Sequence, residues 1–168
     1  MDPLLERKLS KVSRLHAAVQ VIVAQRLSEQ GFVVSLEHEI DRVHVADVLA
    51  YNDTKSLIVE VETGYLPPMF ISCAEDYIEA KLALKALKYS CSVDEFYIAM
   101  PSYMRLPIPR ALTGQLRNRD ELERLSHKVA AFFGNKWAQA IIEEGYRCKI
   151  SGIMLVNLAN KTIKVAPL

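Results

Sequence analysis

The stretch that decides the fold is residues 46–62, ADVLAYNDTKSLIVEVE. Two short segments rich in apolar and β-branched residues flank the polar residues 52–55, and that composition is typical of two strands joined by a tight turn. We therefore predict antiparallel strands at 42–51 and 56–62. Three acidic residues interrupt the apolar pattern: Asp47 in the first strand, and Glu60 and Glu62 in the second.

The segments on either side of this pair extend it to a larger sheet flanked by helices. Residues 32–40 have the same strand-like composition, so three consecutive strands are expected to form an antiparallel meander. Before them, apolar residues recur every three or four positions over 4–30, which predicts an amphipathic helix that ends at Gly31. After them, we predict a helix over 74–89 with Ser72 as its N-cap.

The rest of the chain continues the alternation of helices and strands. The remaining segments are predicted to be a strand at 95–100, an irregular stretch at 102–119, helices at 120–133 and 136–144, and a β-hairpin within 146–165. This order indicates an α/β (α+β) fold in which helices pack on a central mixed sheet. The length of 168 residues fits a single domain, with 1–101 as its core and 102–168 as an extension.

The composition is that of a globular protein with balanced charge. Hydrophobic residues make up 51% of the chain, charged residues 24%, and the net charge is +1, which excludes a disordered chain and a uniformly basic nucleic-acid coat. No apolar run approaches the ~20 residues of a membrane-spanning helix, so no membrane partner is expected. The N-terminus lacks a signal-peptide pattern, and the three separated cysteines form neither a disulfide framework nor a zinc motif. We therefore expect a cytoplasmic protein.

The acidic residues of the central hairpin suggest a cation site. Alternate residues of a strand share a face, so Glu60 and Glu62 point to the same side, and the short turn lets Asp47 lie beside Glu60. Clustered carboxylates repel one another unless a cation or water compensates them. Oxygen ligands suit Mg²⁺ or Mn²⁺, which can activate water for phosphodiester hydrolysis. The alternative is that these carboxylates form a solvated face of the sheet.

The predicted element order and these residues match a known pattern. The order α-β-β-β-α-β, with Asp47 on the second strand, Glu60-x-Glu62 on the third and a lysine-bearing helix next, resembles the PD-(D/E)XK nuclease superfamily. That superfamily includes restriction endonucleases and archaeal Holliday-junction resolvases, and the resemblance covers residues 4–101. It implies a restriction-endonuclease-like core, Asp47 and Glu60 as metal ligands, Mg²⁺ or Mn²⁺ as cofactor, and hydrolysis of DNA.

The chain departs from the family at two positions. Ala46 replaces the usual proline, and Glu62 stands where the family most often has its catalytic lysine. Because a glutamate cannot supply positive charge to a phosphate, we expect Glu62 to assist or orient water. We expect Lys81, on the following helix, to stabilise charge on the phosphate, with Lys85 as the second candidate. The alternative is a catalytically inactive nuclease-fold module that binds nucleic acid or a protein partner.

Members of the family often contribute a polar residue from the first helix to the site. Here the candidates are Glu6, His16 and Gln20. His16 and Gln20 are four residues apart and therefore lie on one face of the predicted helix, where they could act together.

Charge and apolar residues in the second half of the chain suggest partners. Residues 36–62 contain seven acidic and two basic residues, whereas 102–119 contain four arginines and no acidic residue. The predicted nucleic-acid-binding residues are those four, Arg105, Arg110, Arg117 and Arg119, with Tyr103 available for stacking on a base. The alternative is that the arginines pair with the body of the protein. Apolar residues beyond those that a small sheet needs predict a homodimer through the C-terminal helices or hairpin, burying at least ~1,000 Å².

Overall fold

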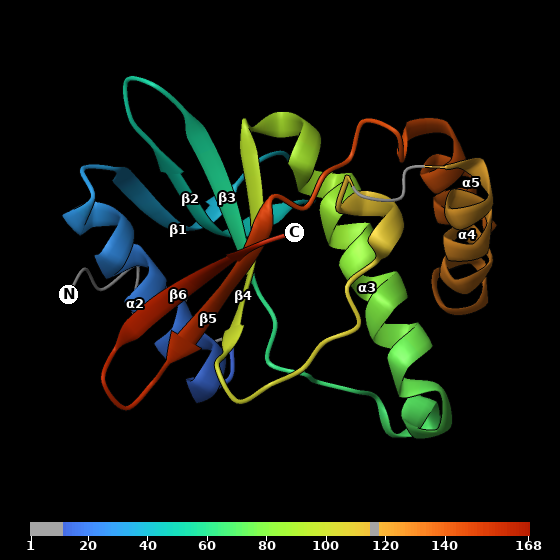
Figure 1. Ribbon diagram of the computed structural model, residues 1–168, viewed down its shortest axis with the longest axis horizontal. Helices are drawn as coiled ribbons and strands as arrows, with labels where there is room; N and C mark the ends of the chain where they lie inside the picture. Colours follow the sequence, from blue (N-terminus) through green and yellow to red (C-terminus); the bar gives the residue numbers. More distant parts are fainter. Residues whose placement is uncertain (1–11, 115–117) are drawn as a thin grey trace.

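The computed structural model describes residues 12–114 and 118–168, and its centre is a six-stranded mixed sheet (Figure 1). The strands, which neighbour one another in chain order, are β1 (Val33–Glu39), β2 (Val45–Tyr51), β3 (Ser56–Val61), β4 (Glu95–Pro101), β5 (Gly152–Asn157) and β6 (Thr162–Pro167). β1, β2 and β3 form the antiparallel meander, β4 and β5 continue the sheet in parallel with β3, and β6 returns antiparallel to β5. The predicted α/β class with a mixed sheet is confirmed.

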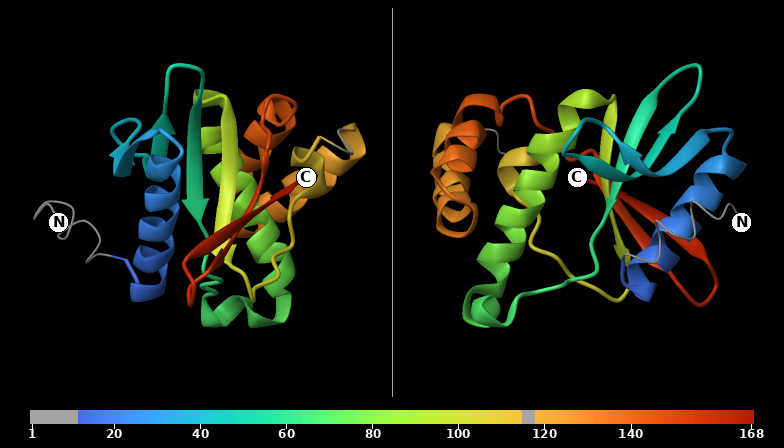
Figure 2. Two further views of the ribbon diagram at one scale, coloured as in Figure 1. Left: turned by 60° about the vertical axis from the view of Figure 1, so that its left-hand side comes forward. Right: turned by 180° about the vertical axis from the view of Figure 1, so that it is seen from behind.

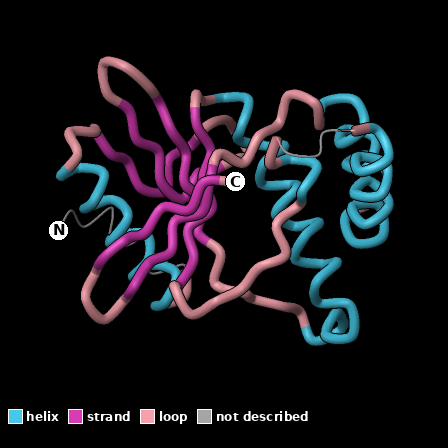
Figure 3. Tube along the Cα trace, viewed as in Figure 1, coloured by secondary structure: helices cyan, strands magenta, loops and turns pink. Residues whose placement is uncertain are grey.

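Helices cover both faces of this sheet (Figures 2 and 3). The four α-helices of the described residues are α2 (Arg14–Glu29), α3 (Ala74–Tyr89), α4 (Arg119–Phe133) and α5 (Asn135–Glu144). α2 packs on one face and α3 on the other, and α4 and α5 form a further layer outside α3. None of these described helices is both long enough and apolar enough to span a bilayer.

β3 is buried along nearly its whole length because it has a strand on each side and a helix over each face. Its residues Val59 and Val61 pack in the apolar core under α2, whereas Ile58 packs in the core under α3. By this alternation Glu60 and Glu62 point toward α3, and they are only 4% and 2% exposed. The alternative of a solvated carboxylate face is therefore wrong.

Several predicted boundaries are confirmed by the local geometry. The helices expected at 74–89, 120–133 and 136–144 match α3, α4 and α5 to within one residue at each end. The turn at 52–55 is held by the side-chain oxygen of Asn52, which accepts from the backbone amides two and three residues further on. Gly31 ends α2 with a φ of +86°, a conformation that favours glycine.

The start of the first predicted helix and the N-cap expected for the second are wrong. A continuous helix over 4–30 does not form, because Ser13 has extended backbone and its hydroxyl accepts from the backbone amide of His16, which makes Arg14 the first helical residue. Ser72 is not the N-cap of α3. A 3₁₀ helix, Pro68–Cys73, runs directly into α3, and no side chain caps the junction.

Two predicted strands begin later than expected. The strand predicted at 42–51 starts at Val45, because Asp41 Oδ1 accepts from the backbone amides of Val43 and His44 and holds that segment in a turn. The hairpin predicted within 146–165 contains no strand before Gly152. The segment ahead of it crosses to the α3 side of the sheet, where Ile150 is fully buried.

Candidate functional site

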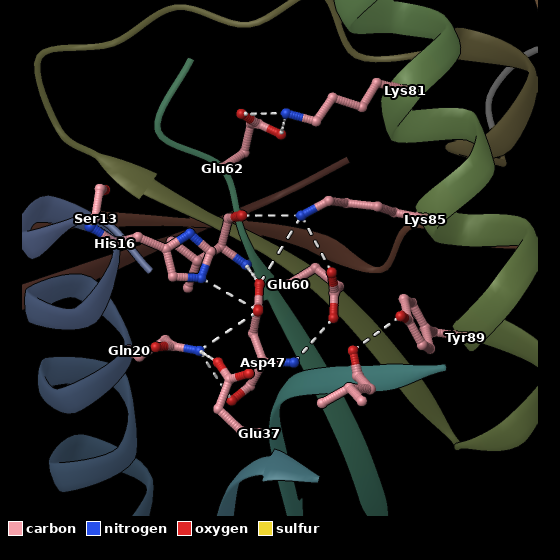
Figure 4. A network of polar contacts seen from close by, with 12 residues as sticks. Ser13, His16, Gln20, Glu37, Asp47, Glu60, Glu62, Lys81, Lys85 and Tyr89 are labelled. Atoms are coloured by element: carbon pink, nitrogen blue, oxygen red, sulfur yellow. Dashed lines mark hydrogen bonds and ion pairs between the residues drawn. The ribbon is translucent and has the colours of Figure 1, made fainter. Parts of the chain in front are cut away.

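The candidate site lies where β2 and β3 separate. The last paired residues of the two strands are Val48 and Val59. Beyond them, acidic side chains take the place of backbone partners: the Asp47 amide donates to Glu60 Oε1 at 3.0 Å, and the Val61 amide donates to Asp47 Oδ2 at 2.7 Å (Figure 4). Because each carboxylate is bound by backbone of the other strand, the positions of Asp47 and Glu60 are fixed by the sheet itself.

The backbone around Asp47 is irregular on both sides. Ala46 packs in the core under α3 while Val48 packs in the core under α2, so the normal alternation is interrupted at Asp47. Glu37 of β1 lies level with Asp47, between the paired residues Leu36–Val48 and His38–Ala46. Glu37 has a φ of +48°, a left-handed conformation that costs a non-glycine residue about 1–2 kcal/mol. Such strain at a polar cluster is commonly associated with a functional role.

Two lysines from α3 reach the carboxylates from the same side. Lys85 Nζ lies 2.9 Å from the Val61 carbonyl oxygen, 3.1 Å from Glu60 Oε2 and 3.9 Å from Asp47 Oδ2. Lys81, about one turn earlier, lies 2.8 Å from one oxygen of Glu62 and 3.1 Å from the other. Thus Lys85, the second candidate from the sequence, contacts the two expected metal ligands, whereas Lys81, the first candidate, pairs with Glu62.

Residues from α2 reach Asp47 from the opposite side. His16 Nε2 lies 3.2 Å from Asp47 Oδ1, and the Gln20 amide nitrogen lies 3.4 Å from the same oxygen and also donates to Glu37 Oε1. The Ser13 cap fixes the start of α2, and the i, i+4 spacing brings both side chains to one face. Asp47 therefore divides the network into two halves, which we call the lysine side and the histidine side.

Burial and neighbouring charges shift the two carboxyl pKa values in opposite directions. Burial, followed by the charge of Asp47, raises the pKa of Glu60 to about 7, although Lys85 opposes the shift. Burial acts on Asp47 as well, but His16, Lys85 and the Val61 amide together outweigh it and lower the pKa of Asp47. Carboxyl groups whose pKa values are driven apart in this way are a feature of reactive sites.

The other two titratable groups facing Glu60 from α3 hold their protons. Burial lowers the pKa of Lys85, but the charges of Glu60 and Asp47 outweigh it and raise that pKa above its ordinary value. Tyr89 donates its hydroxyl to the Val45 carbonyl oxygen at 2.9 Å, and burial raises the pKa of this phenol. Lys85 is therefore charged and Tyr89 neutral at physiological pH.

Side chains on both sides of this network are partly exposed. The exposed fractions of the side chains are 14% for Asp47, 17% for His16, 18% for Lys85 and 24% for Lys81.

The donor atoms fit a divalent cation in two arrangements. On the lysine side, oxygens of Asp47, Glu60 and Val61 converge on one position, that of Lys85 Nζ. On the histidine side, ligand atoms of His16, Glu37 and Asp47 lie within 4.8 Å of one another. Carboxylate and carbonyl oxygens suit Mg²⁺ or Mn²⁺, and imidazole nitrogen suits Mn²⁺. Asp47 belongs to both arrangements.

The predicted nucleic-acid-binding arginines do not join this network. Arg105 is exposed in the loop after β4, and Arg119 pairs with Glu123 on α4. Arg110 borders a depression of about 640 Å³ whose other charged lining residues are Glu75, Glu79, Glu121, Arg124 and Lys128. Arg117 and Glu6 lie outside the described residues. Among the described arginines, Arg119 thus follows the alternative of pairing within the protein, and Arg105 and Arg110 have no ion pair.

Sequence reasoning missed two members of the network, Glu37 and Tyr89. Glu37 could have been found from the turn at Asp41, because a turn over residues 41–44 fixes the register that sets Glu37 level with Asp47. Tyr89 carries no such signal. Its hydroxyl reaches β2 only because α3 crosses the sheet at that point.

Comparisons with protein-family models, with curated proteins and with solved structures found no match to this chain.

Proposed function

We propose that the protein hydrolyses phosphodiester bonds of DNA, with Mg²⁺ or Mn²⁺ bound in the network between α2, β2, β3 and α3. The observation that carries this proposal is the buried pair Asp47 and Glu60, held by backbone amides in the fork between two strands. With Glu62, three carboxylates face two lysines. A divalent cation is the natural compensation for an excess of buried negative charge.

The order of elements supports a restriction-endonuclease-like core. α2, the β1–β2–β3 meander, the α3 crossover and the parallel strand β4 follow the α-β-β-β-α-β order. Acidic residues stand on the second and third strands, and lysines stand on the helix that follows. In this proposal the helical pair α4 and α5 and the β5–β6 hairpin are the family-specific extension.

Each residue has a chemical role in this proposal. Asp47 is the cation ligand that both possible arrangements share, and Glu60 is the second carboxylate beside it. A bound divalent ion would polarise a phosphate oxygen and lower the pKa of an attacking water. The ammonium groups of Lys81 and Lys85 place positive charge where the phosphate gains negative charge in the transition state. Glu62 accepts from the Gly64 amide and from Lys81, and its burial favours the role of positioning Lys81.

The loop after β4 is the proposed contact with nucleic acid. Tyr103 is 70% exposed and Arg105 is exposed two residues later. An exposed aromatic ring beside a cation can stack on a base while the cation contacts a phosphate.

A cleavage assay tests the proposal. Single-stranded, duplex, flap and four-way-junction DNA are incubated with the protein in Mg²⁺ or Mn²⁺, and Asp47→Asn is compared with Glu123→Gln, a variant of an exposed pair on α4. We expect cleavage that falls at least ~100-fold in Asp47→Asn and is unchanged in Glu123→Gln. Absence of cleavage in every combination, or equal cleavage by Asp47→Asn, contradicts the proposal.

One observation favours a second candidate function, a non-catalytic module that binds nucleic acid or protein. Lys85 already compensates part of the negative charge of Asp47 and Glu60 from within the chain, so the fold can be stable without a metal. In this case DNA would be bound but not cut in the same assay, and Asp47→Asn would bind DNA as the wild-type protein does.

The homodimer also stays a proposal. The apolar residues that suggested it are used within the chain: Val129, Ile141, Ile150 and Val156 are fully buried, and Trp137 is half-buried with Lys88 over its ring. Light scattering at micromolar concentration tests it, and a monomeric mass would contradict it.

A further inference from the structure

We propose that His16, Glu37 and Asp47 form the divalent-cation site of this protein, on the histidine side of Asp47, and that the site takes Mn²⁺ in preference to Mg²⁺. This inference deepens the proposed function and rests on it only in assuming that a cation binds near Asp47. It differs from the ligand pair that the family resemblance implies, because Glu60 is not a ligand and Glu37, which the sequence did not single out, is one.

The lysine side is already filled. Lys85 Nζ lies 2.9 Å from the Val61 carbonyl oxygen and 3.1 Å from Glu60 Oε2, with Asp47 Oδ2 at 3.9 Å. These are the oxygens that a cation would need there. A metal ion entering this position has to expel an ammonium group that the same fold holds in place by covalent attachment to α3. The ammonium group of Lys85 is therefore favoured over a metal ion at these oxygens.

The histidine side has donors at the right separation. Ligands about 2.1 Å from one octahedral ion lie about 3.0 Å apart when adjacent and about 4.2 Å apart when opposite. The three ligand atoms of His16, Glu37 and Asp47 lie within 4.8 Å of one another, so small side-chain movements close them on an ion. Asp47 presents Oδ1 to this side, while its Oδ2 accepts from the Val61 amide of β3. It can therefore bind an ion through Oδ1 and keep its hydrogen bond to β3.

A buried polar atom without a partner also points to a ligand here. Gln20 is 0% exposed, its amide lies against Glu37 and Asp47, and its Oε1 has no hydrogen bond among the described residues. An unsatisfied buried polar atom costs about 1–3 kcal/mol. The amide nitrogen now lies against the two carboxylates. In this proposal a cation takes its place there, and rotation about the last side-chain torsion turns the unpartnered Oε1 toward the cation as a further oxygen donor.

The imidazole sets the preference between ions. His16 Nε2 is buried and forms no well-aligned hydrogen bond with any residue that the structure describes, although Asp47 Oδ1 is 3.2 Å away. Neutral imidazole is a ligand for transition-metal ions, whereas Mg²⁺ favours oxygen ligands and retained waters. A mixed nitrogen and oxygen set therefore selects Mn²⁺.

Calorimetric titration of the full chain with MnCl₂ and MgCl₂, without DNA, tests the site. We expect one Mn²⁺ bound at least ~10-fold more tightly than Mg²⁺. Glu37→Gln should weaken Mn²⁺ binding at least ~10-fold, and Glu39→Gln, an exposed residue two positions further along β1, should not change it. Glu60→Gln should keep the affinity for Mn²⁺ within ~3-fold. Mn²⁺ should bind while Lys85 is present, without the substitution Lys85→Met. Circular dichroism checks that each variant is folded.

Pulsed electron paramagnetic resonance of the bound Mn²⁺ gives a second readout. We expect a ¹⁴N coupling from one imidazole that disappears in His16→Gln. The inference is overturned if no Mn²⁺ binds, if Glu37→Gln binds as tightly as the wild-type protein, or if Glu60→Gln rather than Glu37→Gln abolishes binding. Because neither measurement involves DNA, Mn²⁺ binding without DNA cleavage would contradict the proposed function alone.

Discussion

The network at β2 and β3 and the surface of α4 use the same kind of ion pair in different surroundings. Lys85 and Glu60 are 3.1 Å apart with side chains 18% and 5% exposed, whereas Arg119 and Glu123 are 2.8 Å apart with side chains 78% and 47% exposed. The exposed pair is the shorter, but water screens it and can replace either partner. In the buried network each charge depends on a partner within the protein, so burial rather than distance separates the two regions.

The largest expected effect comes from removing the lysine of the buried pair. Lys85→Met leaves Asp47 and Glu60 without their ammonium partner, and we expect a loss of about 3–5 kcal/mol in the free energy of unfolding at pH 8. The matched control is Lys55→Met, which breaks a partly exposed pair with Glu95 and should cost no more than about 1 kcal/mol. Urea denaturation measures both. Equal losses would show that burial does not separate the two kinds of pair.

The pH dependence of stability is the next largest effect. Burial and the charge of Asp47 raise the pKa of Glu60 to about 7 in the folded protein, from the 4.5 of a solvent-exposed glutamate, so between these pH values the folded state holds a proton that the unfolded state has lost. Protonation of Glu60 therefore contributes fully to the free energy of unfolding below pH 4.5. This contribution, on the order of 3 kcal/mol, is lost as the pH rises to about 7. Because the pKa of Asp47 is lowered, this residue changes the pH dependence of stability only in more acidic solution. Urea midpoints from pH 4.5 to 8 should show this decline in the wild-type protein and a smaller one in Glu60→Gln.

A neutral hydrogen bond in the network should have an intermediate effect. Tyr89→Phe removes the donor to the Val45 carbonyl oxygen, and we expect a loss of about 1–2 kcal/mol in unfolding free energy. Tyr51→Phe, at a 48%-exposed tyrosine, should have almost no effect. The comparison would fail if both substitutions lowered the urea midpoint equally.

The smallest expected effect is on the surface of α4. Arg119→Ala removes the exposed pair with Glu123, and we expect the urea midpoint and the thermal midpoint to stay unchanged within experimental error, because water takes over the role of the lost partner. A clear fall in either midpoint would mean that this short exposed pair contributes as a buried one does.

The same contrast explains which parts of the molecule the sequence could predict. The sheet and helices follow from local patterns, the alternation in β3 and the 3–4 spacing in α2, and the turn after Asn52 fixes the register that brings Asp47 beside Glu60. The choice between Lys81 and Lys85 could not be predicted, because it depends on how α3 lies across β3. Glu37 was missed because the strand predicted at 42–51 left out the turn over residues 41–44, which fixes the register between β1 and β2.

The surface ion pair of Arg119 also could not be predicted from the distribution of charge along the sequence. The four arginines of residues 102–119 form a positive segment in the sequence, but Arg119 folds into the first turn of α4 and pairs four residues further along the helix. A count of charges along the chain cannot anticipate this, because it depends on where the helix begins.

The position of the lysines on α3 bears on the order of assembly of the protein. The meander β1–β2–β3 is synthesised before α3 and β4. Glu60 and Glu62 stay in water as long as α3 does not cover their face of β3. They lose that water when α3 closes over the sheet and β4 pairs with β3. The helix that removes the solvent from Glu60 and Glu62 also carries Lys81 and Lys85. Docking of α3 on the sheet thus removes water from these two carboxylates and supplies their ammonium partners in the same step.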